Sequence, residues 1–118
     1  MARILVVDDS AFMRSRLVKL LEEMGHAAIE ANDGTEAVQI FKAEHPDGVL
    51  LDITMPGTSG IEALRRIRDH DPAARVAMVT AVGQQTTVIE ALNAGARDFV
   101  VKPYDPDRVR AAIHKLVE

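Results

Sequence analysis

Short runs of valine, isoleucine and leucine recur along the chain. Four of them cover residues 4–7, 48–51, 76–79 and 99–101. Uninterrupted apolar runs of this length are typical of strands that are buried on both faces. A fifth run, residues 27–31, contains the charged Glu30 and therefore predicts an edge strand.

Between these runs the apolar residues are spaced by three and four, which predicts one amphipathic helix after each strand. The apolar positions of the five helices are Leu17, Leu20, Leu21 and Met24; Ala37, Val38 and Phe41; Ile61, Leu64 and Ile67; Val88, Ile89 and Leu92; and Val109, Ile113 and Leu116. Helix ends are also marked. Ser10 is placed to cap the first helix, and the residues that would end the first four are Gly25, Pro46, the pair Asp71 and Pro72, and Gly95.

Strictly alternating strands and helices predict an α/β fold with a parallel sheet and right-handed crossovers. Five units fit a flavodoxin-like (βα)5 doubly wound sheet with the strand order 2-1-3-4-5. We therefore expect a single domain over residues 1–118. A closed eight-unit barrel is excluded because it needs about 250 residues.

Composition narrows the class of protein. The 118 residues include no cysteine, which excludes disulfide scaffolds and zinc fingers, and the net charge of −4 argues against general binding to nucleic acid. No stretch approaches the roughly 20 apolar residues of a membrane-spanning helix. The first residues run directly into a strand, which leaves no room for a signal peptide. We expect a cytoplasmic protein with no membrane or direct nucleic-acid partner.

Polar side chains stand where the predicted strands end. The first strand runs into Asp8 and Asp9, the third into Asp52, the fourth into Thr80 and the fifth into Lys102. In the predicted order the first and third strands are neighbours at the topological switch point, where doubly wound sheets bind ligands. The three carboxylates should therefore share one crevice.

Three crowded carboxylates must either hold a proton or recruit a cation. Oxygen ligands favour a hard ion such as Mg²⁺, which is commonly completed by phosphate oxygens. A carboxylate can also accept a phosphoryl group as a nucleophile, with Lys102 and Thr80 supplying charge and a hydroxyl donor. We assign Asp52, at the centre of the sheet, as the nucleophile and Asp8 and Asp9 as the metal-side acids.

Each of these residues also has an ordinary structural interpretation. An aspartate at a strand end often belongs to a turn, and the acidic pair before Ser10 could simply favour a helix N-terminus. Thr80 fits a half-buried strand position and Lys102 a solvated strand end. Their joint placement on one edge of the sheet favours the functional interpretation.

The sequence resembles the receiver domains of two-component response regulators, and within them the stand-alone, CheY-like regulators of chemotaxis. The matching segments are residues 6–10 (VVDDS), 51–56 (LDITMP) with Gly60, 79–81 (VTA), 95–96 (GA) and 101–103 (VKP). The likeness to the chemotaxis branch is carried by residues 11–14 (AFMR), 52–56 (DITMP), 82–85 (VGQQ) and 88–91 (VIEA).

The resemblance implies a phosphorylation switch rather than an enzyme. A histidine kinase would phosphorylate Asp52, and Mg²⁺ would be held by Asp9, Asp52, the main-chain carbonyl of Thr54 and, through water, Asp8. Lys102 would pair with the acyl phosphate. Its bond to the following proline, Pro103, would be cis.

Switching would follow from movement of Thr80 toward the phosphoryl group, with Phe99 turning into the vacated space. The fourth helix, fifth strand and fifth helix would then signal to a downstream protein, such as a flagellar motor switch or another effector, through a surface that includes Gln85, Ile89, Phe99 and Tyr104. The domain could act as a monomer or as a phosphorylation-linked dimer. Three residues depart from the family pattern: Phe99 replaces a frequent Tyr, Thr58 replaces a common Met and should loosen its loop, and Val82 is apolar where it flanks the path of hydrolytic water.

Other functions remain open from the sequence. A receiver domain excised from a larger regulator would look identical. A phosphatase of the haloacid dehalogenase type would also use an aspartate nucleophile, but Thr54 stands where it needs a second aspartate. A flavin-binding module would need a phosphate-binding loop after the first strand, where Asp8 and Asp9 would repel the cofactor.

Overall fold

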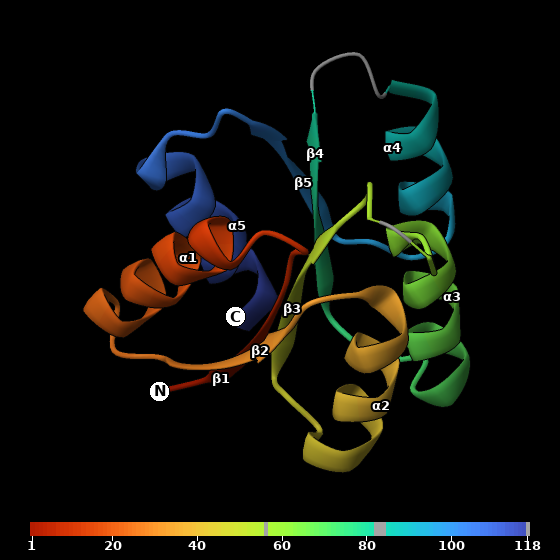
Figure 1. Ribbon diagram of the computed structural model, residues 1–118, viewed down its shortest axis with the longest axis horizontal. Helices are drawn as coiled ribbons and strands as arrows, with labels where there is room; N and C mark the ends of the chain where they lie inside the picture. The colour runs from red at the N-terminus through yellow and green to blue at the C-terminus, as the bar shows by residue number, and fades with distance from the viewer. Residues whose placement is uncertain (56, 82–84, 118) are drawn as a thin grey trace.

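The computed structural model describes residues 1–55, 57–81 and 85–117. Five parallel strands form one sheet in the order β2-β1-β3-β4-β5, with a helix after each strand (Figure 1). The predicted fold and strand order are confirmed. In chain order the elements are β1 (Arg3–Val7), α1 (Ala11–Glu23), β2 (Ala27–Ala31), α2 (Gly34–Glu44), β3 (Gly48–Asp52), α3 (Gly60–His70), β4 (Val76–Ala81), α4 (Gln85–Asn93), β5 (Asp98–Lys102) and α5 (Pro106–Val117).

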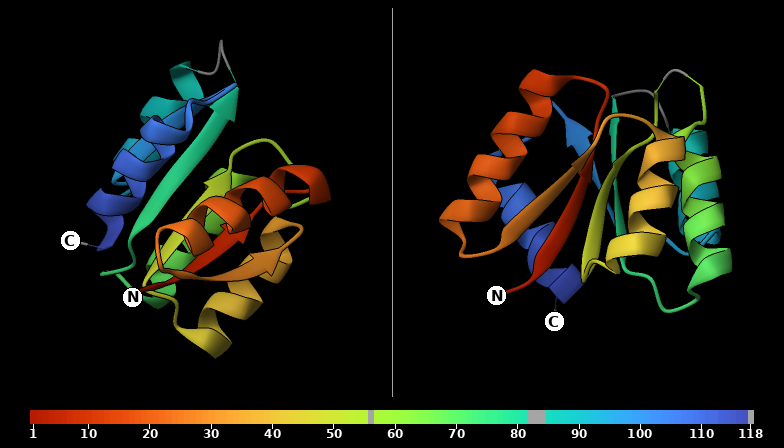
Figure 2. Two further views of the ribbon diagram at one scale, coloured as in Figure 1. Left: turned by 90° about the vertical axis from the view of Figure 1, so that its left-hand side faces the viewer. Right: turned by 60° about the horizontal axis from the view of Figure 1, so that its bottom comes forward.

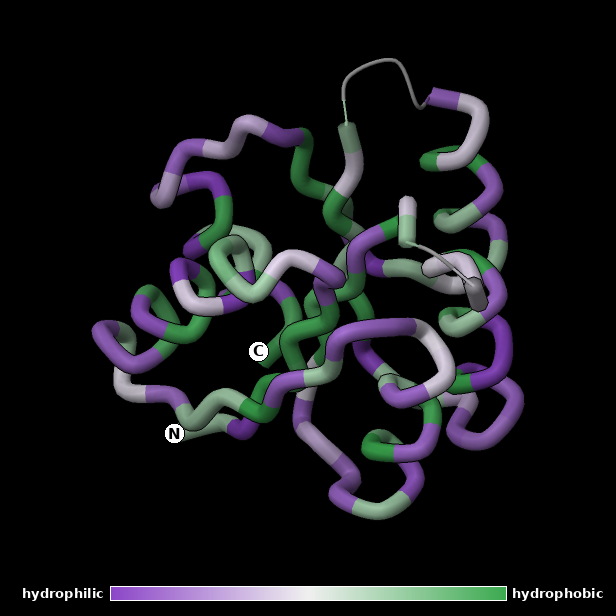
Figure 3. Tube along the Cα trace, in the orientation of Figure 1, coloured by the Kyte–Doolittle hydropathy of each residue, from purple (hydrophilic) through white to green (hydrophobic). Residues whose placement is uncertain are grey.

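Helices cover both faces of the sheet. α1 and α5 lie on one face, and α2, α3 and α4 lie on the other (Figures 1 and 2). Because successive strand residues point to opposite faces, each strand contributes to two separate cores. In β1, Ile4 and Val6 pack under α1 and α5, whereas Leu5 and Val7 pack under the other three helices. Hydrophobic residues accordingly concentrate along the central strands in Figure 3.

The predicted helix boundaries have identifiable causes. The Ser10 hydroxyl accepts a hydrogen bond from the Met13 N–H at 3.2 Å and caps α1. Gly25 and Gly95 follow the ends of α1 and α4 with φ of 83° and 106°, a conformation that glycine adopts without steric cost. No helix in the described parts of the chain is long and apolar enough to cross a membrane.

The two edge strands differ in how well the sequence predicted them. β2 lies at one edge, as Glu30 indicated. The prediction that residues 99–101 are buried on both faces is wrong for one face of β5, which forms the other edge of the sheet: Val100 is buried, but Phe99 and Val101, which point to the opposite face, are only partly covered. Phe99 is half-buried there and Val101 is 37% exposed.

Candidate functional site

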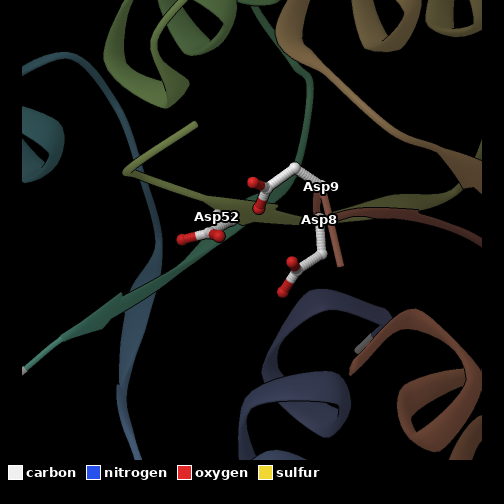
Figure 4. A group of neighbouring side chains, drawn as sticks. All are labelled: Asp8, Asp9 and Asp52. Carbon is white, nitrogen blue, oxygen red and sulfur yellow. The ribbon is translucent and has the colours of Figure 1, made fainter. Parts of the chain in front are cut away.

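The candidate site lies at the carboxyl ends of three strands, β1, β3 and β5. Asp8 and Asp9 directly follow β1, Asp52 is the last residue of β3, and Lys102 is the last residue of β5. Carboxylate oxygens of the three aspartates lie within 4.8 Å of one another (Figure 4). The topology thus brings together acids that are more than forty positions apart in the chain.

Lys102 joins the two buried aspartates. Its Nζ lies 3.2 Å from Asp8 Oδ2 and 3.3 Å from Asp52 Oδ2, and it donates a hydrogen bond to each. The side chains of Asp8 and Asp52 are only 2% and 7% exposed. One ammonium group therefore faces two buried carboxylates, with the exposed Asp9 as a third acid at the rim.

Main-chain groups orient the two buried carboxylates. The Ser10 N–H donates to Asp8 Oδ1 at 2.8 Å, and the Thr54 N–H donates to Asp52 Oδ1 at 3.3 Å. Gly60 allows α3 to begin against this strand end. A Cβ at residue 60 would overlap the Asp52 carbonyl oxygen, so any side chain there would displace the strand end.

Burial and neighbouring charge perturb the titration of the site. Burial raises the pKa of Asp52, and the charge of Asp8 adds to this effect, which Lys102 and the Thr54 N–H only partly offset. Burial opposes the charged form of Lys102, but the carboxylates of Asp52 and Asp8 outweigh it and raise the pKa of the amine. Among the described residues, three carboxylates therefore face the ammonium of Lys102, and negative charge is in excess.

The remaining predicted residues surround this cluster. Thr80 is buried in β4, where its hydroxyl donates to the Ala81 carbonyl at 3.3 Å rather than to a carboxylate. Thr54 is exposed, and Phe99 packs against the core under α2, α3 and α4. The Lys102–Pro103 bond is cis, as expected.

Some of the motif residues cannot be placed. Pro56, Val82, Gly83 and Gln84 lie outside the described residues, and so does the predicted role of Val82 beside a hydrolytic water. Thr58 is described. Its hydroxyl lies 2.9 Å from that of Thr35 in α2, a contact that the expected loosening of its loop did not consider.

Sequence reasoning missed one residue that touches the site. The Arg14 guanidinium donates to the main-chain carbonyl of Asp8 at 2.7 Å and to Glu30 at 3.2 Å. The sequence signal was a basic residue in the first turns of α1, within the segment 11–14 that carries the likeness to the chemotaxis branch, on a side chain long enough to reach back to the strand. That signal is shared by many solvated helix residues.

The donor set fits a hard divalent cation. All three acidic ligands offer oxygen, and no histidine or cysteine is part of the cluster among the described residues. Carboxylate oxygens at this spacing match the preference of Mg²⁺ for carboxylates and water. A cation would also relieve the repulsion that a single ammonium leaves unbalanced. Phosphoryl chemistry with a carboxylate acceptor is the reaction such a site can support.

Comparison with known families agrees with this geometry. The family model described as the response regulator receiver domain matches residues 4–114. The chain belongs to the response regulator receiver domain family. The family assignment makes it a signalling domain rather than a classical enzyme, so the phosphatase and flavin-binding alternatives are set aside.

Two relatives of this receiver domain are named chemotaxis protein CheY. The protein from Thermotoga maritima is 48% identical over 115 residues, which cover 97% of this chain and 96% of the relative. The protein from Bacillus subtilis is 49% identical over 114 residues, covering 96% and 95%. Among solved structures, the receiver domain of NtrX from Brucella abortus superposes with a TM-score of 0.92 at 31% identity, covering 97% of each chain.

Proposed function

We propose that this receiver domain is a phosphorylation switch that accepts a phosphoryl group on Asp52 from a sensor histidine kinase in a Mg²⁺-dependent reaction. The observation that supports it best is the placement of Lys102, whose amine bridges the buried carboxylates of Asp8 and Asp52. Such an arrangement supplies a nucleophile, a cation for the phosphoryl oxygens and acids for a metal ion in one crevice.

The chemical step is a displacement at phosphorus. A carboxylate oxygen of Asp52 forms the new bond to phosphorus, while the bond from phosphorus to the donor histidine nitrogen breaks and its electron pair stays with that nitrogen. Lys102 is placed to pair with a phosphoryl oxygen once Asp52 has reacted. Thr80, one residue beyond the register partner of Asp52 in β4, would supply its hydroxyl to another oxygen after leaving the Ala81 carbonyl.

Mg²⁺ would be held by Asp9, Asp52 and the main-chain carbonyl of Thr54, with Asp8 contributing through water. When bound, the ion neutralises charge on the phosphoryl oxygens and on the acids. Hydrolysis of the aspartyl phosphate in the same site would return the domain to its starting state.

The output surface would be formed by α4, β5 and α5. Exposed hydrophobic side chains gather on α4 and β5, where Ile89 is 60%, Leu92 42% and Val101 37% exposed. Gln85 is exposed on α4, and Phe99 and Tyr104 are half-buried. Movement of Thr80 and Phe99 would alter this surface. Since the two relatives described above are named chemotaxis proteins, we propose a cytoplasmic chemotaxis regulator whose target is a flagellar motor switch or another effector.

Intact mass measurement tests the proposal. The protein is incubated with acetyl phosphate and Mg²⁺, and we expect its mass to increase by one phosphoryl group. The adduct should not form when Mg²⁺ is chelated before the donor is added. Asp52→Asn should not form the adduct. Asp98→Asn is the matched control, because it removes a second buried aspartate outside the site and should be phosphorylated normally. An adduct on Asp52→Asn, or none on the wild type, would contradict the proposal.

A further inference from the structure

Arg14 connects α1 to the end of β1 and to β2, next to the acidic cluster. It lies in α1, and its side chain is only 17% exposed because it folds back toward the end of β1. Nη1 donates to the Asp8 carbonyl oxygen at 2.7 Å, and Nε donates to Glu30 Oε1 on β2 at 3.2 Å. One planar guanidinium thus holds a main-chain oxygen and a carboxylate together.

The Asp8 carbonyl belongs to the peptide unit that joins Asp8 to Asp9. Because a peptide unit is planar, fixing this oxygen fixes the direction in which the chain enters Asp9. The preceding peptide is already held, since the Asp8 N–H donates to the Ala31 carbonyl at 3.3 Å. The Asp8 side chain is held as well, by the Ser10 N–H and by Lys102.

Asp9 has no such side-chain support. It is exposed, and within residues 1–55, 57–81 and 85–117 its carboxylate makes no hydrogen bond or ion pair. The placement of this carboxylate near Asp8 and Asp52 therefore depends on its main chain. Arg14 is the side chain that fixes the peptide leading into it.

The chemistry of this contact requires arginine. A guanidinium presents several N–H groups in a rigid plane and can serve two acceptors at a fixed angle, whereas an ammonium is a compact charge on a flexible stem. Glu30 is the register partner of Val6 in β1, so it stands close to the strand end that Arg14 reaches. Its ion pair with Arg14 ties the guanidinium to β2.

We infer that Arg14, anchored by Glu30, is a positioning residue that orients the Asp8–Asp9 peptide and so presents Asp9 to the divalent ion. This inference rests on the proposed function. Arg14 does not touch the ion or the phosphoryl group, and it acts only through the main chain. Partners of this kind outside the ligand set typically change metal affinity by roughly 10- to 100-fold when they are replaced.

The experiment measures Mg²⁺ affinity of the unphosphorylated protein by calorimetric titration, together with the melting temperature. Arg14→Lys keeps the charge but removes the planar set of N–H donors, and we expect the dissociation constant for Mg²⁺ to rise roughly tenfold. Glu30→Gln should raise it less. In the double variant the loss of Mg²⁺ binding free energy should be smaller than the sum of the losses in the two single variants, because the two residues act as a unit. With acetyl phosphate as donor, saturating Mg²⁺ should restore the rate of adduct formation in Arg14→Lys.

The matched control is the Arg66–Glu62 pair on α3, which has a similar separation of 2.9 Å and is exposed. Arg66→Lys and Glu62→Gln should leave Mg²⁺ affinity unchanged. If Arg14→Lys and Glu30→Gln bind Mg²⁺ as tightly as the wild type, with or without a lower melting temperature, Arg14 is only structural and the inference is overturned. A wild type that binds no Mg²⁺ overturns both the inference and the proposed function.

Discussion

Two buried aspartates in this sheet have opposite electrostatic environments. Asp52 ends β3 and Asp98 begins β5, and the two are 5% and 6% exposed. The pKa of Asp52 is raised, since its burial and the neighbouring Asp8 exceed what one shared ammonium can offset. Burial also acts on Asp98, but hydrogen bonds from Arg108 and the Phe99 N–H and the charge of Lys115 outweigh it, so its pKa is lowered.

The difference lies in the number of partners. Asp98 accepts hydrogen bonds from both terminal nitrogens of Arg108, at 3.1 and 2.8 Å, and lies 3.6 Å from Lys115 Nζ. Asp52 shares Lys102 with a second acid. A fully compensated carboxylate serves to hold β5 and α5 together. The charge of Asp52 is only partly balanced, so its carboxylate still attracts an added cation. This is what a site that binds an ion and reacts requires.

Removing Lys102 should have the largest effect, because it takes away the cation that Asp52 shares with Asp8. In Lys102→Met the acids keep no ammonium, and we expect phosphorylation by acetyl phosphate to slow roughly 100-fold at saturating Mg²⁺, as when one preorganised cation or donor is removed from a reaction site. The rate is measured by intact mass over time. Lys115→Met is the control, because its amine lies beside Asp98 instead. Wild-type rates in Lys102→Met would contradict the role given to this amine.

Removing Arg108 should leave the charge of the buried Asp98 carboxylate only partly balanced. We expect Arg108→Met to lower the free energy of unfolding at neutral pH by about 2 kcal/mol, less than for a fully buried pair because the guanidinium is 40% exposed. Urea denaturation gives the value. Arg110→Met removes the more exposed pair with Asp107 and should cost less than about 1 kcal/mol. Equal losses in the two variants would show that the burial of Asp98 does not matter.

The pH dependence of stability should have opposite signs for the two aspartates. Asp98 has a lowered pKa, so its contribution is present above its ordinary value of 3.8 and is lost as the pH falls through its native value. Asp52 has a raised pKa, so the native state binds the extra proton and the wild type loses stability as the pH rises above 3.8.

The measurement is urea denaturation across this range for Asp98→Asn and Asp52→Asn without Mg²⁺. The advantage of the wild type over Asp98→Asn should grow between the most acidic pH and about pH 4, near the ordinary aspartate pKa. Its advantage over Asp52→Asn should shrink as the pH rises further. If the stability advantage of the wild type changed with pH in the same way against both variants, the opposite pKa shifts of the two aspartates would be refuted.

Much of the candidate site was predictable because it depends on strand ends. Apolar runs located the strands, alternation with helices made the sheet parallel, and parallel strands place their carboxyl ends on one edge. Asp8, Asp9, Asp52 and Lys102 follow from these rules alone. The exposure of β5 at Val101 was not predicted, since an apolar run looks the same in a central strand and at an edge.

The sequence by itself determined the order of the elements, the parallel sheet and the edge on which the acids and the amine meet, because local periodicity and chain direction are enough for these. Only the tertiary structure decided which charges are balanced. Arg14 reaches the Asp8 carbonyl, and Arg108 reaches Asp98, through side chains that cross between elements. Such contacts depend on packing and on the reach of each side chain, and burial then sets how strongly each charge is felt.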